Sequence, residues 1–163
     1  NGGQKYREFA LPGYGAHYHW CAAFVSWVIY NTESNGQKLS DIINFKSTWV
    51  YEFMNDFYKA GKDNPTSTKR FYFNDNCSKL SGKNNLTSTY KPKKGDLIFF
   101  DWKVIFTTMP TDSDHVSHIG IVTGLDGDII NTIEGNTGSG NGIVAEKSYN
   151  LDNCQVVGFG SWY

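Results

Sequence analysis

The first half of the chain has apolar positions in patterns typical of helices. Residues 20–30 form an apolar stretch without glycine, proline or charge, which predicts a buried helix ended by the polar residues 31–36. In residues 47–59 aromatic and aliphatic side chains recur at helical intervals, which predicts a second helix with Ser47 as its N-cap. The arm formed by residues 1–15 is expected to be irregular, with one helical turn.

The second half of the chain is divided into short strands. The apolar run 97–100 lies between polar residues and suits a strand that is buried on both faces. Further short strands, separated by Gly, Asp and Asn, are predicted at residues 118–123, 129–134, 143–145 and 155–159. Helices followed by an antiparallel sheet indicate an α+β fold.

Length and charge narrow the class of protein. A chain of 163 residues suits one domain, and its net charge of −1 gives no general attraction to nucleic acid or an anionic membrane. No apolar run approaches the roughly 18 residues of a membrane-spanning helix. The sequence begins without Met and without a signal-peptide pattern, so we expect a single domain over 1–163 that was processed or excised from a longer chain.

Cys21 stands at the start of the first predicted helix, downstream of Gly13 and Gly15. A helix N-terminus carries partial positive charge and unpaired N–H groups, which stabilise a thiolate and can bind a developing oxyanion. The alternative is a small inert core residue, because free cysteines are often buried. The other two cysteines, Cys77 and Cys154, could be bridged in an exported protein, but spacing does not decide this and two free thiols are the favoured state.

A histidine and a carboxylate are predicted at one end of a hairpin. Asp126-Gly127 is a tight-turn signal, and with those two residues as the loop His118 falls opposite position 135, next to Glu134. A one-residue bulge would bring the two level. Glu134 or Asn136 could then orient the imidazole of His118 as base for Cys21. The alternative is a surface hairpin whose polar residues face solvent.

Other histidines and acidic residues offer competing sites. His115 could replace His118 as the base, although His118 opens a strand and is held more rigidly. His17 and His19 alternate with Cys21 and could suggest zinc, but no closed set of four ligands is present. The pair Asp112/Asp114 lacks the rest of a calcium loop. We therefore expect no metal and no cofactor.

The assembled residues give the chain a family resemblance. Four stretches carry it: 2–6 (Gly-Gly-Gln-Lys-Tyr), 20–27 (Trp-Cys-Ala-Ala-Phe-Val-Ser-Trp), 92–102 (Pro-Lys-Lys-Gly-Asp-Leu-Ile-Phe-Phe-Asp-Trp), and the pair 118–122 and 132–137. In this order they resemble the CHAP family, the cysteine, histidine-dependent amidohydrolases/peptidases. The stretch 103–117 is longer than in many relatives, and its Asp114-His115 is a near copy of their motif, shifted by three positions.

The resemblance implies a papain-like fold and hydrolysis of peptidoglycan, at the sugar–peptide amide or at a stem-peptide or cross-bridge bond. Cys21 would be the nucleophile, His118 the base and then the acid, and Glu134 its orienting residue with help from Asn136. Two tryptophans, Trp20 and Trp102, could line the substrate cleft or belong to the core. A secreted, monomeric enzyme acting at the cell wall is expected.

Two other functions remain open. The chain could be a papain-like amidase or protease that acts on soluble peptides. It could also be a wall-binding module without turnover, although such a module has no need of Cys21, His118 and Glu134 together. The sequence leaves open which bond is cut and which bacterial wall is the target.

Overall fold

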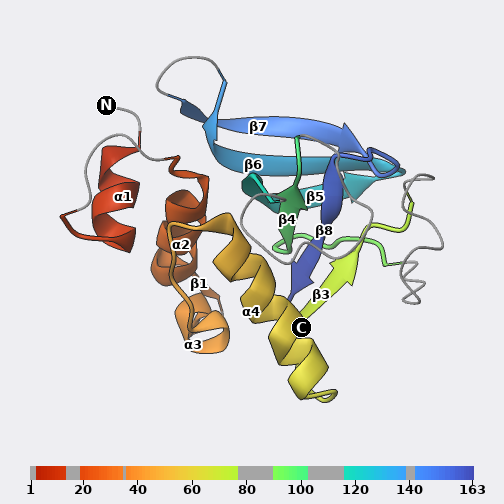
Figure 1. The fold of residues 1–163 in the computed structure, drawn as a ribbon, viewed down its shortest axis with the longest axis horizontal. Helices are drawn as coiled ribbons and strands as arrows, with labels where there is room; N and C mark the ends of the chain where they lie inside the picture. The colour runs from red at the N-terminus through yellow and green to blue at the C-terminus, as the bar shows by residue number, and fades with distance from the viewer. Residues whose placement is uncertain (1–2, 14–18, 35, 77–89, 103–115, 139–141) are drawn as a thin grey trace.

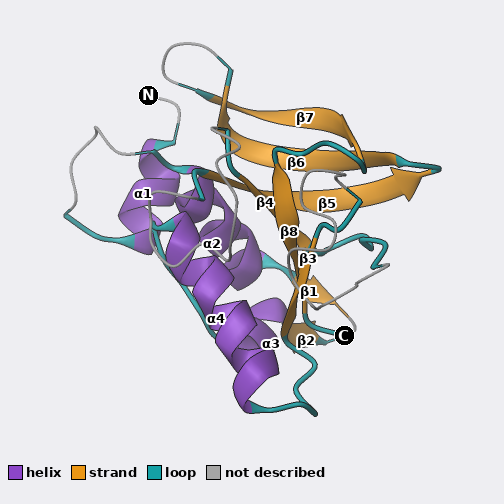
Figure 2. Cartoon of the chain, turned by 45° about the vertical axis from the view of Figure 1, so that its right-hand side comes forward, coloured by secondary structure: helices purple, strands orange, loops and turns teal. Residues whose placement is uncertain are grey.

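The computed structural model describes residues 3–13, 19–34, 36–76, 90–102, 116–138 and 142–163. Figures 1 and 2 show the helices on one side of a strongly twisted sheet. The helices are α1 (Gln4–Ala10), α2 (Cys21–Asn31), α3 (Leu39–Ile43) and α4 (Val50–Asp63). The strands are β1 (Glu33–Ser34), β2 (Gln37–Lys38), β3 (Arg70–Phe73), β4 (Leu97–Phe100), β5 (His118–Asp126), β6 (Ile129–Thr137), β7 (Ile143–Asn150) and β8 (Val156–Ser161). This mixed arrangement confirms the α+β class.

The main sheet has six antiparallel strands in the order β3-β8-β4-β5-β6-β7. The strands β1 and β2 pair separately in a small antiparallel ribbon. In the main sheet β4 is central, and all four of its residues are buried, as its uninterrupted apolar sequence predicts. Leu97 and Phe99 face the helices, while Ile98 and Phe100 belong to a second apolar cluster with Phe159. The sheet is therefore buried on both faces along its middle.

The helix α2 occupies the middle of the helical layer. It contacts α1, α3 and α4 among the helices, and β5 and β6 in the sheet. Its side chains at Ala22, Ala23 and Val25 are fully buried, because the helix is surrounded by other elements on most sides. The lack of charge in this stretch, which predicted a buried helix, thus reflects its central place. The first residue of α2 is set close to the strands β5 and β6 as a result.

Ser47 is not the N-cap of α4, and this sequence prediction is wrong. The helix begins at Val50 with Trp49 as its N-cap residue, and it runs past Gly61 to Asp63. The hydroxyl of Ser47 accepts the N–H of Trp49 at 2.9 Å, so it organises the turn before the helix. The N–H of Ser47 in turn donates to Ser26 Oγ at 3.0 Å, which ties this turn to α2. A tertiary contact to α2 thus fixes Ser47 ahead of the helix start.

The hairpin of β5 and β6 turns one residue later than the sequence predicts. Asp126 pairs with Ile129, so the loop is Gly127-Asp128 and not Asp126-Gly127. Gly127 has φ +59°, which is the conformation that a two-residue turn with glycine in its first position requires. A bulge is present, since the register shifts between Val122 and Gly124, but it does not bring His118 level with Glu134. Because Ile121 pairs with Ile133, Glu134 falls opposite Gly120, two residues along β5 from His118.

The cysteines also differ from expectation. Cys154 is disulfide-bonded, so the prediction that it is a free thiol is wrong. Cys21 is a buried free thiol. Cys77 lies outside the described residues. None of the helices that the structure describes is long and apolar enough to cross a membrane.

Candidate active site

Cys21 is the first residue of α2, and its side chain is 1% exposed. The residue before it, Trp20, is the N-cap and accepts the N–H of Phe24 through its carbonyl oxygen at 2.9 Å. The ring of Trp20 stacks on Tyr6 of α1 at 5.4 Å, and Gly3 leaves the space that this ring fills. The start of α2, and with it Cys21, is therefore anchored by packing against α1.

His118 and Glu134 form a buried pair beside Cys21. His118 is the first residue of β5, and its Nε2 lies 2.8 Å from Oε2 of Glu134 on β6. The two side chains are 7% and 1% exposed. Cys21 lies close enough to His118 for its side chain to raise the pKa of the imidazole. Because Nε2 is engaged by Glu134, the other ring nitrogen, Nδ1, is the one available to the thiol. The structure brings together the three residues that the sequence singled out.

The charge of the imidazole depends on these two neighbours. Burial by itself lowers the pKa of His118, but hydrogen bonds and the negative charges of Cys21 and Glu134 outweigh it and raise the pKa to about 9. The imidazole is consequently protonated at neutral pH.

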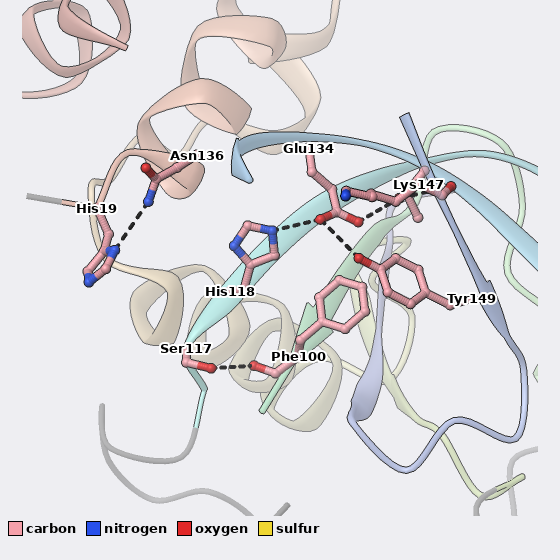
Figure 3. Close-up of polar contacts among 9 residues, drawn as sticks. His19, Phe100, Ser117, His118, Glu134, Asn136, Lys147 and Tyr149 are labelled. Atoms are coloured by element: carbon pink, nitrogen blue, oxygen red, sulfur yellow. Dashed lines mark hydrogen bonds and ion pairs between the residues drawn. The ribbon is translucent and has the colours of Figure 1, made fainter. Parts of the chain in front are cut away.

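Glu134 is held by further donors that sequence analysis missed. Its Oε1 accepts the hydroxyl of Thr132 at 2.6 Å, and its Oε2 also accepts the hydroxyl of Tyr149 at 3.2 Å (Figure 3). Thr132 lies two positions before Glu134 on the same strand, so strand alternation could have placed it on the same face. Tyr149 comes from β7, and no spacing in the sequence predicts that it reaches Glu134.

Asn136 is bonded to a different histidine. Its Nδ2 lies 3.1 Å from Nδ1 of His19, which precedes Cys21 by two residues (Figure 3). The backbone of Asn136 has φ +60°, and Gly142 packs against its side chain. Asn136 thus lies near the start of α2, since its neighbour Gly135 approaches Trp20 closely. Its predicted help in orienting His118 stays a prediction.

The two tryptophans occupy different environments. Trp20 is 2% exposed and lies in the core, so its ring offers no surface to a substrate in this structure. Trp102 is 42% exposed, and its ring lies 5.5 Å from that of His118 and stacks on Phe100 at 4.9 Å. An exposed aromatic ring beside the imidazole is well placed to contact a bound molecule. Only Trp102 therefore remains a good candidate for that role.

Several competing residues lie outside the described residues: His17, Asp112, Asp114 and His115. The predictions made for these residues therefore stay predictions. Within the described part of the chain, no group of three or more His, Cys, Asp or Glu side chains could hold a metal ion.

A family comparison bears on this geometry. The model of the CHAP domain matches residues 13–136, which is more than half of the chain and includes Cys21, His118 and Glu134. The chain belongs to the CHAP family. CHAP domains are cysteine- and histidine-dependent amidohydrolases or peptidases, and they usually act on peptidoglycan. Membership therefore indicates a hydrolase of the amidase or peptidase type.

Other comparisons add little to the CHAP assignment. No curated protein matches the chain. Among solved structures, the crystal structure of Ly7917 is similar over 46% of this chain and 30% of its own, at 23% identity and a TM-score of 0.33. The match thus spans less than a third of that protein, and so low a score carries no argument.

Proposed function

We propose that this CHAP domain is a peptidoglycan hydrolase that cleaves an amide bond by thiol catalysis. The observation that carries the proposal is the hydrogen bond between the buried His118 and Glu134, on an imidazole that lies close to the thiol of Cys21. A nucleophile, its base and the residue that orients the base are the parts that covalent hydrolysis needs.

The reaction follows from the charges of these groups. The thiolate of Cys21 adds to the carbonyl carbon, and the backbone N–H groups of the first turn of α2, which have no partner within the helix, face the developing oxyanion. Collapse of this intermediate breaks the C–N bond, and the leaving amine takes the proton of His118. A thioester on Cys21 and a neutral imidazole remain.

Water completes the cycle. Neutral His118 takes a proton from water as the oxygen adds to the thioester carbon, and breakage of the C–S bond releases the acid. The products are the carboxylic acid, which gives up its proton to solvent at neutral pH, the thiolate of Cys21 and the imidazolium of His118, so the initial charges of the enzyme are restored. Glu134 keeps the imidazole aligned through both halves. In this scheme the enzyme is papain-like, because helices precede the sheet and the cysteine nucleophile stands at the start of a helix. Asn136 is proposed as an assisting residue.

The substrate is proposed from the family and from the surroundings of His118. CHAP domains usually act on peptidoglycan, whose amide bonds include the sugar–peptide amide and the stem and cross-bridge bonds. The exposed ring of Trp102 beside His118 supports contact with the chain that carries the scissile bond. Peptidoglycan lies outside the cytoplasmic membrane, so we propose a secreted, monomeric enzyme that works at the cell wall.

Digestion of purified peptidoglycan tests the proposal. Wild type should release new amino groups, Cys21→Ala should release none, and fragment masses should name the bond. Trp102→Ala should raise KM, whereas Trp49→Ala, which changes a tryptophan that is 52% exposed at the start of α4, should not. No release from walls of several chemotypes would refute the cell-wall function. Turnover of soluble peptides would then support an amidase of other substrates, and binding to walls without any turnover a wall-binding module.

A further inference from the structure

Both oxygens of the Glu134 carboxylate take part in hydrogen bonds. Oε1 accepts the hydroxyl of Thr132, while Oε2 accepts both Tyr149 and Nε2 of His118. In Figure 3 His118 and Tyr149 reach the carboxylate of Glu134 from different sides. A carboxylate that only had to pair with His118 would need just one of these three contacts.

We infer that Thr132 and Tyr149 are positioning residues that fix the rotation of the Glu134 carboxylate, so that Oε2 stays aimed at His118 and the imidazole stays charged beside Cys21. The inference rests on the proposed function, which it deepens: it assigns two residues that the reaction needs although neither is required to touch the substrate.

Thr132 anchors the oxygen that His118 does not use. Its side chain is fully buried, and its hydroxyl lies 2.6 Å from Oε1 of Glu134. The competing acceptor, the carbonyl oxygen of Lys147, is 3.5 Å away, so the hydroxyl proton belongs to Glu134. With Oε1 held in this way, the carboxylate cannot turn about its Cγ–Cδ bond without losing a charge-assisted hydrogen bond.

Tyr149 secures the oxygen that faces His118. Its ring packs on Phe100 at 4.7 Å, and the ring of Phe100 lies 5.8 Å from that of His118, so the phenol is held by the same aromatic group as the imidazole. Burial and the charge of Glu134 raise the pKa of Tyr149 above its ordinary value. The hydroxyl therefore keeps its proton and acts only as a donor to Glu134 over the working pH range.

The direction in which the pKa of His118 shifts distinguishes a positioning role for Thr132 and Tyr149 from an effect on the charge of Glu134 alone. In a rigid site, loss of a donor would leave more negative charge on Glu134, and the pKa of His118 would rise. If the donors serve to align the carboxylate, their loss lets it turn away, the bond to Nε2 weakens, and the pKa of His118 falls. A role only in sheet stability would leave the pKa of His118 unchanged.

The test is an NMR titration of the His118 ring in wild type, Thr132→Val, Thr132→Ser and Tyr149→Phe. Tyr90→Phe is the matched control, because the hydroxyl of Tyr90 donates to Asp96 at 2.6 Å, and Asp96 precedes β4 at the end opposite to Phe100 and His118. It thus removes a phenol–carboxylate bond of the same kind away from His118. Cys21 alkylation against pH gives a second readout that needs no peptidoglycan.

We expect Thr132→Val and Tyr149→Phe each to lower the pKa of His118 by about half to one unit, a roughly threefold to tenfold loss of its affinity for the proton. Thr132→Ser keeps the hydroxyl and should restore the wild-type value, and Tyr90→Phe should not move it. An unchanged or raised pKa of His118 in Thr132→Val overturns the inference, as does the same outcome in Tyr149→Phe. If one variant fails to fold, the other decides. Inactivity of wild type on peptidoglycan would count against the proposed function and leave this titration valid.

Discussion

The side chain of Glu134 occupies space that exists because residue 120 is glycine. A Cβ at Gly120 would lie 2.7 Å from Cγ of Glu134 and 3.4 Å from its Cδ. Gly120 is the third residue of β5, two positions after His118. The strand that carries the imidazole therefore also provides the room through which the carboxylate reaches it.

Replacement of Gly120 tests this relationship. Gly120→Ala should push the carboxylate away from His118, because the contact with Cγ is too short for both groups to stay in place. We expect a loss of about 1–3 kcal/mol in the free energy of unfolding from overpacking. A fall in the pKa of His118 should accompany it. Gly124→Ala is the control, because it lies on the same strand and no atom in the described part of the chain comes within 4 Å of the added Cβ. Equal effects of the two variants on His118 would contradict the account.

The raised pKa of His118 predicts how stability changes with pH. The pKa is about 9 in the folded state against 6.5 for an unperturbed histidine, so the folded state binds the proton more tightly. The resulting stabilisation, on the order of 3 kcal/mol, is fully present below about pH 6.5 and lost as pH rises through about 9.

Denaturant unfolding of wild type and His118→Asn between pH 6 and pH 10 checks this prediction. The difference in free energy of unfolding between the two proteins should be largest near pH 6 and shrink toward pH 10. A difference that stays constant over this range would show that the proton on His118 contributes nothing to stability.

The close approach of Gly3 to Trp20 predicts that a side chain at position 3 disturbs the residue before Cys21. Its φ is +87°, and an added Cβ would lie 2.3 Å from the ring of Trp20, the residue before Cys21. Gly13 has a similar φ of +85°, but no heavy atom of the described residues lies within 4 Å of such a Cβ, which makes it a matched control.

Both Gly3→Ala and Gly13→Ala should lose about 1–2 kcal/mol through the left-handed backbone. Gly3→Ala should lose a further 1–3 kcal/mol, approximately, as the ring of Trp20 is displaced. Thermal unfolding measures the difference, and equal melting temperatures of the two variants would mean that Gly3 does not anchor Trp20.

The parts of the site that local pattern governs could be predicted from the sequence. The uncharged apolar run placed Cys21 at a helix start. The turn signal placed His118 and Glu134 near one end of a hairpin, although the loop is one residue later and Glu134 lies opposite Gly120 instead of His118. The error in the turn is physical: Asp126-Gly127 and Gly127-Asp128 share the glycine, and only the backbone conformation of Gly127 distinguishes them.

What depends on distant strands could not be predicted. Tyr149 reaches Glu134 from β7, and the backbone N–H of Ser47 donates to Ser26 Oγ of α2, so in each case a tertiary contact decides. The disulfide bond of Cys154 likewise depends on which residues the fold brings together, because its spacing alone does not show it. The sequence left both Trp20 and Trp102 as residues of the cleft or of the core, yet one is buried in the core and the other is exposed beside His118.

The central claim is that His118 activates Cys21, and the rate of alkylation of Cys21 at different pH values tests it most directly. Iodoacetamide labelling should be followed by mass spectrometry of the peptide that contains Cys21, in wild type and in His118→Ala. We predict that wild type reacts at nearly its full rate well below pH 8, whereas His118→Ala reacts appreciably only as pH approaches about 8.5, as an ordinary thiol does. A wild-type rate that rises only above pH 8, in step with the variant, would contradict the claim.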